Sequence, residues 1–183
     1  MEVCEAILVR KRRWSESSLI ITWLTDRFGA LQTSARGALR PGSAFAGKLD
    51  LFHRAEIGFV FSRSSTLHSL REVSLRSPSS GIAANYSALA MASYFSELAA
   101  AICPPMQPSP EIHDLLLRAL DHLEKTVPSL RAFQHFEREA ARLVGILDPA
   151  GKTPPHVSLG GLCGTLPRSR SQALSALSPT ARD

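Results

Sequence analysis

The sequence predicts an α+β protein with two domains, an N-terminal five-stranded OB-fold β-barrel followed by an α-helical bundle. Five short apolar segments occupy the first 75 or so residues, with no long helical pattern between them. Pro78-Ser79-Ser80-Gly81 then interrupts the chain, and the apolar residues beyond it recur at three- and four-residue steps. We therefore place the barrel at residues 1–78, the helical domain at 79–150 and a Pro/Gly/Ser-rich segment at 151–183.

The β half is predicted from short apolar runs separated by turn residues. The expected strands are Glu5–Lys11, Ser18–Thr25, Ala30–Gly37, Leu51–Phe61 and Thr66–Leu75. Alternation is clearest in the fourth, where one face holds Leu51, His53, Ala55, Ile57, Phe59 and Phe61, and the other holds Phe52, Arg54 and Glu56. The turn Asp26-Arg27-Phe28-Gly29 should close a hairpin. Ser43–Leu49 is compatible with the short helix that an OB barrel usually carries between strands three and four.

Three helices are expected after the interruption. The first carries an apolar stripe from Ala84 to Ile102 and ends at Pro104-Pro105. The second begins at Ser109-Pro110, with serine as the cap candidate and proline at the first helical position, and its stripe continues to Val127. The third follows Pro128 and extends to Leu147. Gly151–Pro167 is predicted to be a loop, and Arg168–Leu177 is compatible with a short terminal helix.

Charge is unevenly distributed along the chain. The net charge is +5, and residues 1–80 carry all of it, with 12 Lys/Arg against 7 Asp/Glu. A basic excess confined to one half favours a polyanionic partner, although a basic surface that only aids solubility is the plain alternative. There is no apolar run near the roughly 20 residues that cross a bilayer, and no secretory pattern. We expect a cytoplasmic protein that does not bind membranes.

Motifs for catalysis or metal binding are missing from the sequence. It has no phosphate-binding loop, no nucleophile elbow and no HExxH motif, so we expect no enzymatic activity. The cysteines Cys4, Cys103 and Cys163 are far apart and lack zinc spacing, so we expect free thiols, no metal and no cofactor. His53 alternates with apolar residues and is interpreted as a packed strand residue.

Basic and aromatic residues of the β half are the candidates for binding nucleic acid. Cations that neutralise phosphates release counterions, and aromatic rings stack on unpaired bases. Trp14 is the candidate platform, whereas Trp23 and Phe28 are interpreted as core or turn residues, and Phe52 is left open between platform and core. The candidate nucleic-acid-binding residues are Arg10, Lys11, Arg12, Arg13, Trp14, Arg36, Arg40, Lys48 and Arg54.

The helical half offers a second kind of site. A groove between amphipathic helices can accept a short apolar peptide whose acidic terminus is held by arginines at the rim. The candidate rim residues are Arg118, Arg131, Arg138 and Arg142, and solvated surface charge is the alternative interpretation of each.

An ordered series of short motifs resembles the RecO family of recombination mediators. The matching motifs are Glu5–Leu8 with Arg10–Arg13, then Glu16, Thr25, Gly29, Ala35–Ala38 and Ser43, followed by Tyr94–Leu98, Leu115-Leu116, Leu120, Phe136-Glu137 and Gly145–Pro149. The resemblance covers about residues 1–150. It implies an OB-fold domain and a helical domain, binding to single- and double-stranded DNA, and annealing of complementary strands. It also implies docking on the C-terminal tail of the bacterial single-stranded-DNA-binding protein, and recombinase loading with a RecR-type partner. The setting is DNA repair and recombination after DNA damage, in a bacterial, nucleoid-associated location.

The sequence departs from this family in its last part. Many members carry a four-cysteine zinc module after the segment that matches Gly145–Pro149, and only Cys163 stands there in this chain. The chain also ends sooner than is usual in the family, which shrinks the helical domain, and we expect this to affect partner docking by that domain more than DNA binding by the barrel. The alternatives are an OB-fold protein-interaction adaptor and an RNA-binding module without annealing activity.

Overall fold

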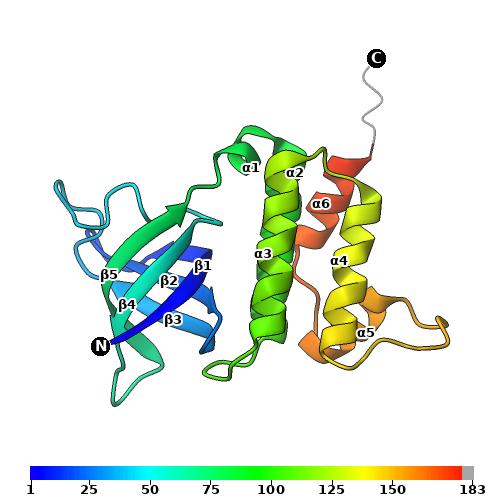
Figure 1. The fold of residues 1–183 in the computed structure, drawn as a ribbon, viewed down its shortest axis with the longest axis horizontal. Helices are drawn as coiled ribbons and strands as arrows, with labels where there is room; N and C mark the ends of the chain where they lie inside the picture. Colours follow the sequence, from blue (N-terminus) through cyan, green and yellow to red (C-terminus); the bar gives the residue numbers. More distant parts are fainter. Residues whose placement is uncertain (179–183) are drawn as a thin grey trace. The chain divides into compact units, whose positions relative to one another are not determined.

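Five strands form a closed barrel in the computed structural model, which describes residues 1–178 (Figure 1). They are β1 (Glu2–Arg13), β2 (Leu19–Thr25), β3 (Gly29–Ala35), β4 (Arg54–Val60) and β5 (Leu67–Ser77). The order around the ring is β1-β2-β3-β5-β4, with β3 and β5 parallel and all other pairs antiparallel. The predicted five-stranded OB-fold barrel is confirmed.

The barrel closes because alternate residues of its strands are apolar and point inward. Leu8, Trp23 and Ile57 are among the fully buried side chains of this core. Trp23 also buries a polar group, and its indole Nε1–H donates to Thr33 Oγ1 at 2.8 Å, so that this donor is satisfied. The prediction that Trp23 is a core residue is confirmed.

A bulge in β1 explains why four consecutive cations can be exposed. The pairing of β1 with β2 shifts register between Leu8 and Arg10, and the pairing of β1 with β4 covers only Glu2 to Ile7. A bulge bends and twists its strand. The Arg10–Arg13 run therefore forms one arm of the β1–β2 hairpin beyond the point where β4 pairs, and all four residues are exposed.

The segment between β3 and β4 differs from the prediction. Ser43–Leu49 forms a series of turns and no helix. Gly42 and Gly47 adopt φ of 72° and 71°, which a right-handed helix does not accommodate. Phe52 adopts φ 66° and is buried, so β4 begins only at Arg54. The predicted alternation consequently holds for Ala55, Ile57 and Phe59, which are buried, but not for residues 51–53 or for Phe61, which is exposed beyond the end of β4.

Six helices follow the barrel within the described residues. They are α1 (Ser80–Ala84), α2 (Tyr86–Ile102), α3 (Pro110–Lys125), α4 (Leu130–Leu143), α5 (Pro155–Cys163) and α6 (Ser169–Leu177). The prediction of a loop over Gly151–Pro167 is wrong for α5, which starts at a Pro-Pro pair that suits a helix N-terminus. The predicted terminal helix is present as α6. The described part of the chain divides into two compact units, the first formed by residues 1–79 and 103–113 and the second by residues 80–102 and 114–178.

A buried polar network joins three helices of the second unit. Glu137 of α4 is 3% exposed and accepts a hydrogen bond of 2.7 Å from the Tyr94 hydroxyl of α2. Its carboxylate also accepts bonds of 2.7 and 3.3 Å from the Arg170 guanidinium of α6. Burial, with the adjacent Glu137 carboxylate, raises the pKa of Tyr94, and the hydrogen bond to Glu137 raises the pKa of Arg170. The carboxylate is thus paired rather than left as an isolated buried charge.

Candidate nucleic-acid interface

A groove of about 460 Å³, called here the basic groove, lies beside the β1–β2 arm and the 38–53 loop. Its cations are Lys11, Arg12 and Arg13. Its remaining lining is Leu19, Ala38, Leu39, Phe45, Ala46, Gly47, Leu49, Asp50 and His53. The floor is therefore largely apolar, with the positive charges supplied by β1.

Two of the three cations in the basic groove already have partners. Lys11 Nζ lies 2.7 Å from Asp50 Oδ1 and donates to the Leu49 carbonyl at 3.2 Å. Partial burial acts to raise the pKa of Asp50, but the bonds from Lys11 and from the Leu51 N–H outweigh it and hold the pKa below its usual value. Arg13 donates to the carbonyls of Ser15 and Glu16 at 3.2 and 3.0 Å. Lys11 and Arg13 therefore help to hold the loop and the turn in place.

A second groove of about 680 Å³, called here the tryptophan pocket, lies between the 14–18 turn, the end of β3 and the start of β5. It is lined by Trp14, Ser15, Ser17, Ser18, Ser34, Arg36, Gly37, Arg40 and Leu67. Trp14 is 59% exposed, and the Arg12 guanidinium carbon lies 5.7 Å from the centre of its ring. This contact is a cation–π interaction that joins the basic groove to the tryptophan pocket.

The structure thus places six of the nine predicted nucleic-acid residues in the two grooves. Arg10 is exposed on β1, Lys48 is half-buried in the 38–53 loop, and Arg54 is half-buried on β4; none of the three lines either groove. Phe52 is buried in the core and is no base platform. His53 precedes β4 instead of lying in a strand, and its Nδ1 lies 3.4 Å from the Lys48 carbonyl.

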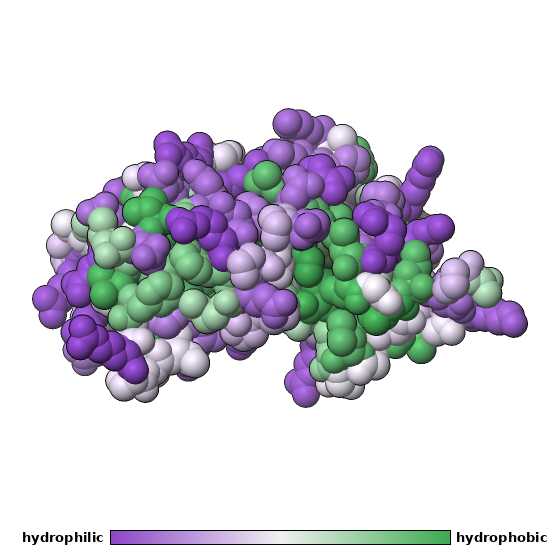
Figure 2. Space-filling view, turned by 60° about the horizontal axis from the view of Figure 1, so that its bottom comes forward, coloured by the Kyte–Doolittle hydropathy of each residue, from purple (hydrophilic) through white to green (hydrophobic). Residues whose placement is uncertain are grey.

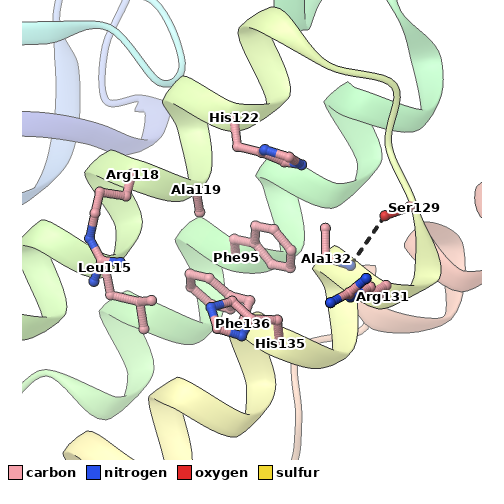
Figure 3. Close-up of a pocket in the computed structure, with 10 residues that line it drawn as sticks. All are labelled: Phe95, Leu115, Arg118, Ala119, His122, Ser129, Arg131, Ala132, His135 and Phe136. Carbon is pink, nitrogen blue, oxygen red and sulfur yellow. Dashed lines mark hydrogen bonds between the residues drawn. The ribbon is translucent and has the colours of Figure 1, made fainter.

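The helical unit has a pocket of about 440 Å³, called here the helical pocket (Figure 3). Phe95 of α2 and Phe136 of α4 stack at its floor, with ring centres 4.0 Å apart and planes inclined by 14°. Figure 3 shows Arg118 and Arg131 on opposite sides of the two rings. In Figure 2, hydrophobic surface gathers on the helical part of the visible face. The pocket combines an apolar floor with a cationic rim.

The predicted arginines of the helices separate into two pairs. Arg118 and Arg131 line the helical pocket, whereas Arg138 and Arg142 do not. Arg118 forms an ion pair with Asp114 at 2.8 Å, and Arg142 forms one with Glu139 at 2.9 Å. In both ion pairs the two residues lie about one turn apart on the same helix. The hydrogen bond from Arg142 lowers the pKa of Glu139. Such exposed pairs are weak, so Arg118 can turn toward a bound anion.

Sequence reasoning missed His122 and His135, which also line the helical pocket, and it placed Phe95 and Phe136 in the apolar stripes of their helices without assigning them to a site. A signal was present, since His122 follows Arg118 by four residues and His135 follows Arg131 by four. That spacing puts each pair on one helix face.

Within residues 1–178 no three His, Cys, Asp or Glu side chains gather in a group that could hold a metal ion. No helix described in the structure is long and apolar enough to cross a membrane.

Two family models match the chain. Residues 1–79 match the recombination protein O N-terminal model, and residues 83–147 match the recombination protein O C-terminal model. A DNA repair protein RecO from Exiguobacterium sibiricum is 30% identical over 167 residues, which are 91% of this chain and 63% of that protein. One from Rhodopirellula baltica is 29% identical, over 76% of this chain and 52% of the relative. One from Anaeromyxobacter dehalogenans is 28% identical, over 86% and 67%. This chain spans about half to two thirds of the length of these relatives.

Proposed function

The chain belongs to the RecO family, and from this premise we propose that it is a DNA repair protein. In this proposal it binds single- and double-stranded DNA, anneals complementary strands and helps to load a recombinase in gap repair. The observation that carries the proposal is the convergence of cations and one exposed aromatic ring on the two neighbouring grooves of the barrel. Arg12 is exposed in the basic groove, and Trp14, Arg36 and Arg40 are exposed in the tryptophan pocket.

The mechanism is electrostatic and has no covalent step, so we propose that the protein is not an enzyme. Two complementary strands repel each other through their phosphates. A cationic surface that binds both strands lowers this repulsion and releases counterions. Stacking on an aromatic ring keeps unpaired bases accessible. Base pairing then replaces the protein contacts, and the duplex is released to further steps.

For the helical pocket we propose the C-terminal tail of the single-stranded-DNA-binding protein as the occupant. The support is a chemical match between pocket and peptide. The stacked rings of Phe95 and Phe136 form a floor that suits apolar side chains, and Arg118 and Arg131 at its sides suit an acidic peptide terminus. A RecR-type partner and a site of action on the bacterial nucleoid in the cytoplasm complete the proposal, and both rest on family membership alone.

Strand annealing in the presence of the single-stranded-DNA-binding protein tests the proposal directly. We expect annealing of complementary oligonucleotides coated with that protein, and slower annealing when the coating protein lacks its C-terminal tail. Arg131→Ala should reduce the advantage given by the tail, whereas Arg138→Ala, an exposed change outside the helical pocket, should not. No annealing on bare or coated strands would refute the proposed function. Equal rates with and without the tail would refute the proposed docking.

A further inference from the structure

The tryptophan pocket has a composition that differs from that of the basic groove. Its lining includes the exposed Trp14, two arginines (Arg36 and Arg40) and four serines. None of the described residues that line it is Asp or Glu, whereas the basic groove contains Asp50, which already pairs with Lys11. Its volume lies in the range of about 300–1,000 Å³ typical of small-ligand sites. These groups match one nucleotide, with a base for the indole and a phosphate for the guanidinium groups.

The walls of the pocket are held in place by hydrogen bonds. Within the 14–18 turn, the N–H groups of Trp14 and Ser15 donate to the Ser18 carbonyl at 2.9 and 3.3 Å. The guanidinium of Arg13 donates hydrogen bonds to two carbonyl oxygens of the same turn, those of Ser15 and Glu16. The backbone that carries Trp14 is thus ordered before any ligand arrives, which lowers the entropy lost on binding.

The arginine wall is attached to the same turn. Leu39 N–H donates to the Ser17 carbonyl at 2.9 Å, and Gly37 N–H donates to Ser18 Oγ at 3.3 Å. Gly37 can take this position because its φ is 68°, and its carbonyl accepts from the Arg40 N–H at 3.1 Å. The segment that carries Arg36 and Arg40 is therefore fixed relative to the backbone of the 14–18 turn.

One face of the indole has a cation nearby. The Arg12 guanidinium carbon lies 5.7 Å from the ring centre. A base stacked on Trp14 would thus have a positive charge beside its platform, in addition to the guanidinium groups of Arg36 and Arg40. Stacking needs an exposed base face, and bases within a duplex are already stacked on their neighbours. A site built in this way distinguishes unpaired from paired DNA.

We propose that the tryptophan pocket is a single-nucleotide site for unpaired DNA, in which a base stacks on Trp14 and its phosphate is held by Arg36 and Arg40. Duplex DNA is held by the cations of the two grooves and does not use Trp14. This assignment rests on the proposed function and goes further, because it separates single-strand from duplex binding at one side chain.

Tryptophan fluorescence provides the test, because the chain has two tryptophans and Trp23 is fully buried. The signal that responds to acrylamide should therefore come from Trp14. Labelled oligo(dT), an abasic oligomer of the same length and a duplex are titrated against the wild-type protein, Trp14→Ala, Trp14→Phe and Arg36→Ala/Arg40→Ala. Arg71→Ala, which removes an exposed cation outside both grooves, is the charge control.

Oligo(dT) should quench Trp14 and protect it from acrylamide, and the abasic oligomer should do neither. Trp14→Ala should weaken oligo(dT) binding about 5- to 100-fold and duplex binding less than about twofold, with much of the loss restored in Trp14→Phe. The double arginine variant should lower the single-strand salt slope by about 0.7 for each phosphate that is no longer neutralised. Oligo(dT) binding that leaves Trp14 open to acrylamide, or that survives Trp14→Ala unchanged, would overturn this assignment and leave the proposed function standing. Failure of the wild-type protein to bind any DNA would overturn both.

Discussion

Removing Arg170 should destabilise the helical unit by about 3 kcal/mol. The Arg170 side chain is 23% exposed and the Glu137 side chain 5% exposed, so Arg170→Ala leaves a buried carboxylate that keeps its hydrogen bond from the Tyr94 hydroxyl but loses its countercharge. Breaking a buried pair from one side typically costs about 3–5 kcal/mol, and the partial exposure of Arg170 favours the lower end. The change also removes the guanidinium from the face of the Phe133 ring, whose centre is 5.7 Å away.

Chemical denaturation followed by helical ellipticity at 222 nm measures this loss. Arg168→Ala is the matched control, because Arg168 flanks the same helix, is exposed and makes no side-chain cap bond; its cost should stay below about 0.5 kcal/mol. Arg170→Lys keeps the charge but loses the planar fork, and should fall between the two. In a Glu137→Gln background, Arg170→Ala should cost clearly less than in the wild type. A loss below about 1 kcal/mol, or the same loss in both backgrounds, would refute the reasoning.

Three further predictions concern the barrel and the thiols. Burial lowers the pKa of His68, and its Nδ1 accepts the Ser62 N–H, so the neutral ring is the native form. The contribution of His68 to stability should be complete above about pH 6.5 and should be lost below it, by up to about 1.4 kcal/mol per pH unit. Thermal unfolding of His68→Gln should show a weaker dependence of stability on pH. Burial raises the pKa of Cys4 to about 12 while Cys163 is only half-buried, so iodoacetamide should modify Cys163 first in the native protein, as peptide mass analysis can check. Gly29 has φ of 61°, and a Cβ there would collide with backbone carbonyls of the 104–107 segment, so Gly29→Ala should cost at least about 2 kcal/mol in urea unfolding; near-wild-type stability would contradict the glycine argument.

The sequence predicted the elements that a repeating pattern defines. All five strands and the main helices were found because inward residues recur with a period of two or near 3.6. It failed where a single φ decides the conformation. Residues 43–49 were compatible with a short helix, but Gly47 takes a left-handed φ, and Phe52 does the same despite its side chain. In α5, the glycines that favoured a loop lie after a Pro-Pro start that supports a helix.

The candidate sites were predicted by residue type but not by partner. Four adjacent cations looked equivalent in the sequence, yet Lys11 pairs with Asp50 and Arg13 with two carbonyls, interactions that depend on how the 14–18 turn and the 38–53 loop fold back. In the helices, charge alone did not distinguish Arg118 and Arg131 from other exposed arginines. The apolar floor between α2 and α4 makes that distinction, and it arises only when the helices pack.

Closure of the barrel also limits the pairing of strands between copies of the protein. Where a strand hydrogen-bonds to two neighbours, the ring offers no row of unpaired amides for another chain to extend; the Arg10–Arg13 end of β1, which pairs with β2 alone, is an exception. At that end of β1 the four exposed cations oppose such joining, because like charges on two copies repel each other. The shortest seam of the ring lies between β3 and β5, where three residue pairs join the two strands.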